Sequence, residues 1–290
     1  MFGKEDGRYK INKKKVDLLE QPWDILIMLD ACRYDYFKKY VEKTELEGNL
    51  KKAISPATWT MEWLNKVFGE DYLDDVIYVS ANPFVNSKRD VEFNGRWGDK
   101  RHFSGRKHFK EIINLWDYAW NYTSYTVLPE DVTSEAMKSI DLNPNMRHIL
   151  HYMQPHEPYL SNPITQDIDG TKLEKRSFFR KMIMAVMELS KVFIGDRPIW
   201  KIAYETGFLP KHGVGNIWVR GREKLLREYY MDNLTQAMNN VENIIEMYPN
   251  KKILIVADHG EKLLEHGSYG HGGRRVKELI EVPWMEIHYE

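Results

Sequence analysis

The chain has 290 residues, of which 42% are hydrophobic and 13% aromatic. This composition supplies a globular core for one large or two small domains and excludes a disordered chain. The formal net charge of −1 provides no global attraction for nucleic acid, so we expect no nucleic-acid partner.

Cysteine content and targeting signals bear on the compartment. The chain contains one cysteine, Cys32, so an internal disulfide is impossible and a cysteine-based zinc site is disfavoured. Residues 1–10 lack the apolar stretch of a signal peptide, and no run reaches the roughly 18 apolar residues that span a bilayer. These features favour a cytoplasmic protein without a transmembrane segment.

The first elements in the chain alternate between strand and helix patterns. Residues 23–30, WDILIMLD, form a continuous apolar run that ends in an acid, as expected of a buried parallel strand. The next elements are a helix at 32–43, a strand at 51–55, a helix at 60–69 that Gly69 ends, and a strand at 75–83.

The same alternation continues in the rest of the chain. A weak strand at 124–128 is followed by a helix at 129–140 that starts with proline, a strand at 147–153, a helix at 222–247 and a strand at 251–258. Strand, loop and helix repeat in this order, which predicts an α/β fold with a doubly wound, mostly parallel sheet flanked by helices.

Residues 160–221 depart from this alternation. They contain a helix pattern at 173–194 and then a stretch rich in glycine, proline and aromatic residues. We interpret them as an inserted helical and loop cap, so that residues 1–290 form a single domain. The aromatic and basic side chains of the cap suit an anionic ester with an apolar or sugar part, or else core packing with a solvated rim.

Polar residues follow most of the predicted strands. In an open α/β sheet, ligands bind beyond the carboxyl ends of the strands, so these residues are expected to meet at one edge. Carboxylates, hydroxyls and imidazoles together suit a divalent cation. The residues are Asp30, the segment 55–60 that ends in Thr60, Asn82, His156, and Asp258 with His259.

Each of these residues also has a purely structural interpretation. Asp30 and Thr60 could cap the helices that follow them, and His266 and His271 could lie in a solvated glycine-rich turn. Asp258 is harder to explain in this way, because an acid that ends a buried strand is costly to desolvate without a partner. The combined placement of the residues favours a site.

Several segments together resemble the sulfatase-like part of the alkaline phosphatase superfamily. In that family an acid ends the first strand, the nucleophile opens the helix after the second strand, and Asp-His-Gly-Glu and Gly-His-Gly motifs follow the last strand. The same order spans roughly residues 24–287 here. The resemblance implies an alkaline phosphatase-like core that lacks the C-terminal subdomain. The matching segments are LDACRYDYF (29–37), SPATWT (55–60), ADHGEKLLEHGSYGHGG (257–273) and VKELIEVPW (276–284).

The resemblance implies a role for each matching residue. Asp30, Thr60, Asp258 and His259 match the ligands of one divalent metal ion, for which Mn, Mg, Ca and Zn are candidates. Thr60 also matches the nucleophile. Contacts with the transferred group fall to His156 and His271, with His266 as a lesser candidate; Asn82 is a candidate substrate contact from its position after the third strand.

Some positions depart from the family pattern. Met61 and Glu62 follow Thr60, where relatives usually have proline and serine. A Cys-x-Pro-Ser-Arg motif is absent, which disfavours a formylglycine enzyme. The mid-chain Asp-x-x-x-His pair of the two-metal phosphatases has no convincing copy, so one metal is favoured over two.

The expected function is therefore a metal-dependent hydrolase of phosphate or sulfate esters. Thr60 would form a covalent intermediate, and His156 and His271 would donate to the oxygens of the transferred group. Two alternatives stay open. One is a phosphoryl-group transferase, of the phosphoglycerol or phosphoethanolamine type, or a mutase on the same scaffold. The other is a non-catalytic binding protein that keeps the fold. The substrate would be an anionic ester, with a sugar-linked or lipid-linked form left open.

Overall fold

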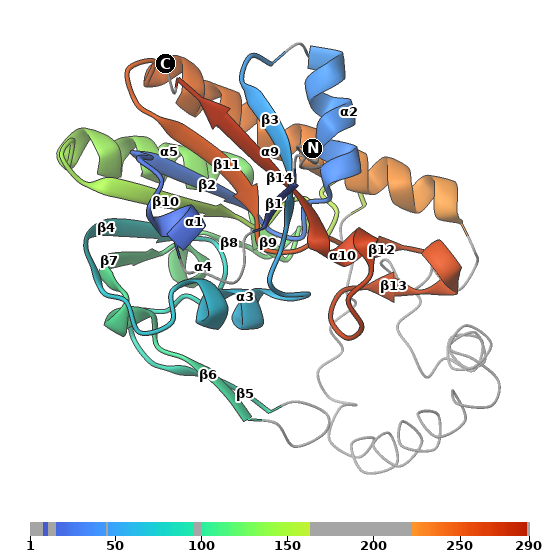
Figure 1. The fold of residues 1–290 in the computed structure, drawn as a ribbon, viewed down its shortest axis with the longest axis horizontal. Helices are drawn as coiled ribbons and strands as arrows, with labels where there is room; N and C mark the ends of the chain where they lie inside the picture. The colour runs from blue at the N-terminus through green and yellow to red at the C-terminus, as the bar shows by residue number, and fades with distance from the viewer. Residues whose placement is uncertain (1–7, 11–15, 45, 95–99, 163–221, 289–290) are drawn as a thin grey trace, which may run out of the picture.

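A computed structural model describes residues 8–10, 16–44, 46–94, 100–162 and 222–288 of the chain. They build an eight-stranded sheet in the order β1-β3-β14-β11-β2-β10-β4-β7 (Figure 1). Neighbouring strands are parallel except that β14 runs antiparallel to both β3 and β11. The predicted α/β class with a mostly parallel sheet is confirmed. The strands are β1 Arg8–Lys10, β2 Ile25–Leu29, β3 Asn49–Ile54, β4 Leu73–Ser80, β7 Phe109–Asn114, β10 Arg147–Tyr152, β11 Ile253–Ala257 and β14 Glu281–Ile287.

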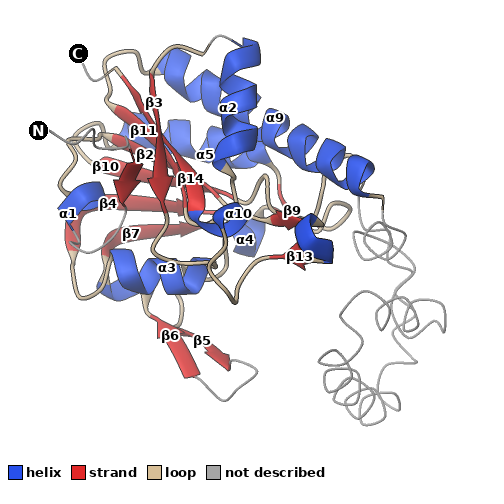
Figure 2. Ribbon diagram, turned by 45° about the vertical axis from the view of Figure 1, so that its right-hand side comes forward, coloured by secondary structure: helices blue, strands red, loops and turns tan. Residues whose placement is uncertain are grey.

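Helices cover both faces of the sheet (Figure 2). On one face lie α2 (Tyr34–Thr44), α5 (Pro129–Leu142) and α9 (Glu223–Met247), and on the other lie α1 (Val16–Leu19) and α3 (Thr60–Val67). Successive side chains of a strand point to opposite faces, and β10 shows this directly. Tyr152 shares a hydrogen bond with Thr133 of α5, whereas His151 bonds to Tyr78 on the α3 face. Short helical segments are η1 Gly105–Lys107, α4 Leu115–Tyr118, η3 Glu265–Gly267 and α10 Lys277–Ile280.

Some elements differ from the sequence prediction. The weak strand expected at 124–128 is only Thr126–Val127 (β9), which pairs with Trp120–Asn121 (β8) outside the main sheet. The edge strand β7 was not predicted, because Lys110 and Glu111 are exposed and interrupt its apolar pattern. Two further small pairs are β5 Val91–Asn94 with β6 Lys100–Phe103, and β12 Lys262–Leu263 with β13 Tyr269–Gly270. The cap predicted at 160–221 lies outside the described residues from 163 onward, as does its helix at 173–194.

The strand register places the candidate residues at one edge. Leu29 at the end of β2 lies opposite Ala257 of β11 and Tyr152 of β10. The residues that follow, Asp30 and Asp258, therefore emerge side by side at the carboxyl edge. Strands β2 and β11, which precede Asp30 and Asp258, are buried at every position. The two acids therefore extend directly from the buried centre of the sheet.

Candidate active site

Three side-chain oxygens surround one nitrogen at the carboxyl edge of the sheet. His259 Nε2 lies 3.3 Å from Asp258 Oδ2, 3.4 Å from Thr60 Oγ1 and 3.7 Å from Asp30 Oδ1. All four residues are at least 96% buried, since Thr60, the most accessible, is 4% exposed. The structure thus brings together Asp30, Thr60, Asp258 and His259, the set that the sequence singled out for a metal.

The donor atoms of this cluster fit a divalent cation. Ligands held about 2.0–2.2 Å from a tetrahedral ion are roughly 3.3–3.6 Å apart, close to the spacing observed here. Within the part of the chain that the structure describes, Asp30 Oδ1 and Asp258 Oδ2 are buried and have no hydrogen-bond partner. Buried carboxylate oxygens are costly unless a positive charge pairs with them. Asp30 and Asp258 also form, with His151, a buried group whose ligand atoms all lie within 4.8 Å of one another, as in a site that could hold a metal ion.

Asp30 is held in place by its other carboxylate oxygen. Asn82 Nδ2 donates to Asp30 Oδ2 at 2.8 Å, and His151 Nε2 lies 3.6 Å from the same oxygen. Burial alone would raise the pKa of Asp30, but its contact with His151 and the charges of nearby imidazoles hold that pKa well below its usual value. Asp30 therefore remains a carboxylate, with Oδ1 directed at the cluster.

The orientation of His151 follows from its neighbour Tyr78. Burial raises the pKa of the Tyr78 hydroxyl far above its ordinary value, so this hydroxyl keeps its proton. It lies 2.9 Å from His151 Nδ1 and is the natural donor to it. The ring proton of His151 then resides on Nε2, which faces Asp30. His151 was not predicted as a site residue, although an ionisable residue near the end of a buried strand is the same signal that drew attention to Asp30.

Asp258 is fixed by two backbone amides. Its Oδ1 accepts hydrogen bonds from Ala31 N at 3.1 Å and from His259 N at 2.9 Å, which leaves Oδ2 for the cluster. Ala31 adopts φ 58°, in the left-handed region that costs a non-glycine residue energy. That turn aims its amide at Asp258. The strained backbone therefore lies directly beside the candidate ligands.

Neither Asp30 nor Thr60 serves as a helix cap. Helix α2 begins at Tyr34, four residues after Asp30, and Thr60 is the first helical residue of α3, with Trp59 at the N-cap position. The loop before Thr60 is joined to the last loop of the chain, because Gly272 N donates to Thr58 O at 2.7 Å. This contact brings the loop that carries His271 close to Thr60.

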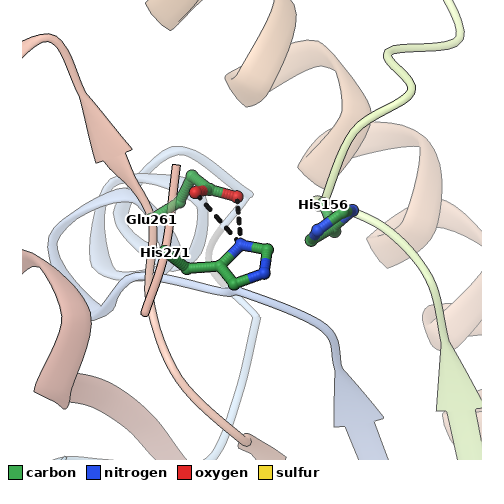
Figure 3. A group of neighbouring side chains, drawn as sticks. All are labelled: His156, Glu261 and His271. Atoms are coloured by element: carbon green, nitrogen blue, oxygen red, sulfur yellow. Dashed lines mark hydrogen bonds and ion pairs between the residues drawn. The ribbon is translucent and has the colours of Figure 1, made fainter. Parts of the chain in front are cut away.

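A second group of side chains lies next to the first. His271 Nδ1 is 3.3 Å from Glu261 Oε1, and the His271 ring centroid is 4.9 Å from that of His156 (Figure 3). The His271 ring centroid is also 4.6 Å from that of His259. Burial alone would lower the pKa of His271, but the charge of Glu261 raises it to about 9. Glu261 therefore favours a positive charge at this position. His266 belongs to η3, and its side chain lies outside the described set.

Arg33 anchors the loop that carries Glu261. Its Nη1 donates to Glu265 Oε1 at 2.7 Å and to the Glu261 carbonyl at 3.2 Å, and its other nitrogens pair with Asp35. The Arg33 side chain is 8% exposed and that of Glu265 17%, so their pair is largely out of water, whereas the Asp35 side chain is half exposed. The arginine after the first strand thus supports the site through the loop rather than touching the cluster itself.

Gly260, between His259 and Glu261, has no room for a side chain. A Cβ at this position would lie 2.2 Å from the Glu278 carbonyl oxygen, so the backbone would have to move. We expect Gly260→Ala to lower the free energy of unfolding by about 3 kcal/mol, measured as a lower midpoint in urea. Gly272→Ala is the control, because a Cβ there meets nothing within 4 Å and only its φ of +81° is strained. It should cost about 1–2 kcal/mol. Equal midpoints for Gly260→Ala and the wild type would contradict the packing argument.

This architecture is the alkaline phosphatase-like fold that the sequence predicted. No protein-family model matches the chain, and no curated protein sequence does. The soluble domain of lipooligosaccharide phosphoethanolamine transferase A from Neisseria meningitidis aligns over 97% of this chain and 76% of its own, with a TM-score of 0.55 and 13% identity. The integral membrane form of that transferase aligns over 91% of this chain, which spans about half, 48%, of its length, at a TM-score of 0.55 and 13% identity.

A hydrolase of phosphorus esters has the same fold. Phosphonate monoester hydrolase of Agrobacterium radiobacter aligns over 92% of this chain and 68% of its own, with a TM-score of 0.52 and 13% identity. At 13% identity the likeness establishes the fold only, so the activity has to be inferred from the residues of the site. Among the described helices, none combines the length and apolar character that crossing a membrane requires.

Proposed function

We propose that this protein is a metal-dependent enzyme that cleaves phosphate or sulfate esters with Thr60 as its nucleophile. One observation carries the proposal. Thr60 Oγ1 lies 3.4 Å from His259 Nε2, in the same buried cluster as Asp30 Oδ1 and Asp258 Oδ2, which have no hydrogen-bond partner among the described residues. The Thr60 hydroxyl caps no helix, so helix capping does not explain its position in the cluster.

Asp30, Thr60, Asp258 and His259 would hold one divalent cation. When bound, the cation supplies Lewis-acid stabilisation of negative charge on neighbouring oxygens. Asn82 was predicted to contact substrate, but both of its side-chain polar atoms have partners, Asp30 Oδ2 and Phe84 N. We therefore assign it to orienting Asp30, together with His151.

The chain's own residues would carry the chemistry in two displacements. In the first, Thr60 Oγ1 bonds to phosphorus or sulfur while the bond to the leaving oxygen breaks, and the hydroxyl proton passes to solvent. His156 and His271 would donate to the non-bridging oxygens, and His271 can protonate the leaving oxygen. In the second, the oxygen of water or an alcohol bonds to the same centre while the bond to Thr60 Oγ1 breaks; the attacking hydroxyl gives its proton to solvent, and Thr60 takes one up. Water makes the protein a hydrolase, and an alcohol makes it a transferase.

Group transfer is the second candidate function. Its support is the fold likeness to the Neisseria meningitidis phosphoethanolamine transferase, which covers 97% of this chain. Both candidates share the first displacement and differ only in the acceptor. An anionic ester with a sugar or lipid part is the proposed substrate class. The single, buried Cys32 favours the cytoplasm as compartment, which cell fractionation would test.

Chelation tests the proposal directly. The protein should hydrolyse bis(4-nitrophenyl) phosphate, 4-nitrophenyl phosphate or 4-nitrophenyl sulfate. Removal of metal with EDTA should lower kcat by at least about 100-fold, and Mn²⁺, Mg²⁺, Ca²⁺ or Zn²⁺ should restore it. Release of nitrophenolate reports the first displacement, so it detects hydrolysis and transfer alike. A radiolabelled alcohol, such as glycerol, then separates the two, because only a transferase incorporates the label into a new phosphate or sulfate ester.

Absence of turnover on all three esters with every cation would contradict the enzymatic proposal. If the protein still bound metal in that case, a non-catalytic binding role would be the better description.

A further inference from the structure

We propose that Tyr230 of α9 is a positioning residue for Asp258, because it holds the turn whose backbone amide orients that carboxylate. The Tyr230 hydroxyl acts on Asp258 through one intermediate residue, Ala31. The inference rests on the proposed function, since it concerns the affinity of the Asp30 and Asp258 cluster for its cation. Tyr230 lies 199 residues from Ala31 along the chain, so local sequence patterns do not connect the two.

The Tyr230 hydroxyl bonds to the segment that directly follows Asp30. It donates to Ala31 O at 2.6 Å and accepts from Arg33 N at 2.9 Å. Tyr230 is fully buried, and burial raises the pKa of its hydroxyl well above the ordinary value, so the proton donated to Ala31 stays in place. A phenylalanine would fill nearly the same volume. The oxygen therefore adds one bond at each end of the turn 31–33, which packing alone would not supply.

The turn needs such support because its first residue is strained. Ala31 adopts φ 58°, a conformation that is disfavoured for a residue with a Cβ and persists only where surrounding contacts hold it. Its backbone is held from two sides. Ala31 N donates to Asp258 Oδ1 at 3.1 Å, and Ala31 O accepts from the Tyr230 hydroxyl. The bond to Tyr230 thus stabilises the conformation in which the Ala31 amide reaches Asp258.

Asp258 depends on that amide for its orientation. Its Oδ1 has two donors, and one of them, His259 N, belongs to the next residue and moves together with Asp258. Ala31 N comes from the end of another strand, 227 residues away. Of the two bonds, the one from Ala31 therefore fixes the carboxylate relative to Asp30 and directs Oδ2 at the cluster. Contacts that orient a metal ligand typically change metal affinity by about 10–100-fold.

Helix α9 is a firm support for this contact. Asn233 lies three residues after Tyr230, on the same side of the helix, and is also fully buried. Its Nδ2 donates to His156 O at 3.0 Å, and its Oδ1 accepts from Leu160 N at 2.8 Å. His156 N in turn donates to Asp30 O at 3.1 Å. The helix is thus joined to the loops after both β2 and β10, which keeps Tyr230 in register with the turn.

The metal affinity of Tyr230→Phe tests the inference. Metal-free protein is titrated by calorimetry, without substrate, with whichever of Mn²⁺, Mg²⁺, Ca²⁺ and Zn²⁺ binds the wild type most tightly. For the site that Asp258→Asn weakens, we expect the dissociation constant to rise about 10-fold in Tyr230→Phe. The variant removes one oxygen atom and leaves the ring in place, so it should fold, as circular dichroism would show.

Tyr152→Phe is the matched control. It also removes a fully buried hydroxyl with a hydrogen bond, which Tyr152 shares with Thr133 of α5 at 2.7 Å. A buried hydrogen bond is lost in both variants, so both should have a lower midpoint in urea. Tyr152→Phe should nevertheless keep the wild-type dissociation constant, because its hydroxyl does not bond to the turn.

A rescue experiment separates positioning from a purely structural role. Glycine adopts positive φ without steric cost, so a turn with Ala31→Gly needs the Tyr230 hydroxyl less. We expect the double variant of Ala31→Gly and Tyr230→Phe to bind the cation at least about 3-fold more tightly than Tyr230→Phe alone. Its urea midpoint should not recover, because a buried methyl group is lost as well.

The possible failures are distinguishable. Wild-type metal affinity in folded Tyr230→Phe would overturn the inference and leave the proposed function standing. A loss of affinity that Tyr152→Phe shares and Ala31→Gly does not relieve would also overturn it, since that loss would follow stability rather than the turn. A wild type that binds none of the four cations would contradict the ligand set, and with it both the proposed function and the role of Tyr230.

Discussion

Thr60→Ala should abolish turnover of aryl phosphate or sulfate esters and leave the fold intact. The variant removes the only hydroxyl that lies against His259 Nε2 in the described cluster, at 3.4 Å, and the covalent step has no substitute for it. Loss of a nucleophile lowers kcat by at least about 1,000-fold. The free energy of unfolding should change by about 1 kcal/mol or less, because Thr60 Oγ1 makes no helix-capping bond that the change would remove. Steady-state kinetics and urea unfolding measure the two effects.

Two further variants make this test specific. Thr60→Ser keeps the hydroxyl and should retain measurable turnover. Thr58→Ala removes a hydroxyl that is equally buried and lies two residues earlier, so it should keep kcat within a few-fold of the wild type. Wild-type kcat in Thr60→Ala would show that the nucleophile is another group and would remove the main support for the proposed function.

Asp258→Asn should remove one metal ion per chain without disturbing the backbone. The substitution is isosteric, and the amide oxygen can still accept from Ala31 N and His259 N, as Oδ1 does now. Those two N–H donors fix the orientation of the side chain, since a flipped amide would face them with its own N–H groups. The NH₂ group then takes the place of Oδ2 and cannot bind a cation. We expect the dissociation constant of that metal to rise by at least about 100-fold.

Thermal unfolding gives an independent readout of the same change. A cation that binds only the folded state raises the Tm of the wild type, and Asp258→Asn should lose most of that increase. With chelator present, the Tm of Asp258→Asn should equal or exceed that of the wild type. The metal-free variant has one carboxylate fewer beside Asp30, and so less repulsion between buried negative charges. Asp75→Asn is the control, since Asp75 pairs with Arg147 on the side of the sheet away from the cluster and should not affect metal content. Wild-type metal affinity in Asp258→Asn would refute the proposed ligand set.

The sequence predicted the sheet well because its central strands are buried on both faces. Strands β2 and β11 are continuous apolar runs that end in acids, a pattern that points to parallel strands and to a polar carboxyl edge. The edge strand β7 was not predicted, because the exposed Lys110 and Glu111 interrupt its apolar pattern. An edge strand needs to be buried only in part to pair with the sheet.

The candidate ligands were predicted from local context, whereas their supporting residues were not. Asp30, Thr60, Asp258 and His259 each follow a strand or open a helix, and the family resemblance ordered them. Asn82, just after β4, and His151 of β10 contact Asp30, and Tyr78 of β4 acts through His151. Asn82 is 52 residues from Asp30, and Tyr78 is 73 from His151. A periodic sequence pattern predicts which face of the sheet a side chain points to. It does not predict which side chains of other strands it contacts.

The sequence by itself determined the fold class, the sheet edge at which the candidate polar side chains meet and their residue types, because burial and strand ends leave local traces in composition. Only the tertiary structure decided which oxygen of Asp30 faces the cluster, that Glu261 joins His156 and His271, and that Arg33 holds their loop. These outcomes depend on contacts between distant segments, such as Arg33 with Glu265, 232 residues apart. The separation of two residues along the chain does not predict their distance in space until the order of the strands in the sheet is known.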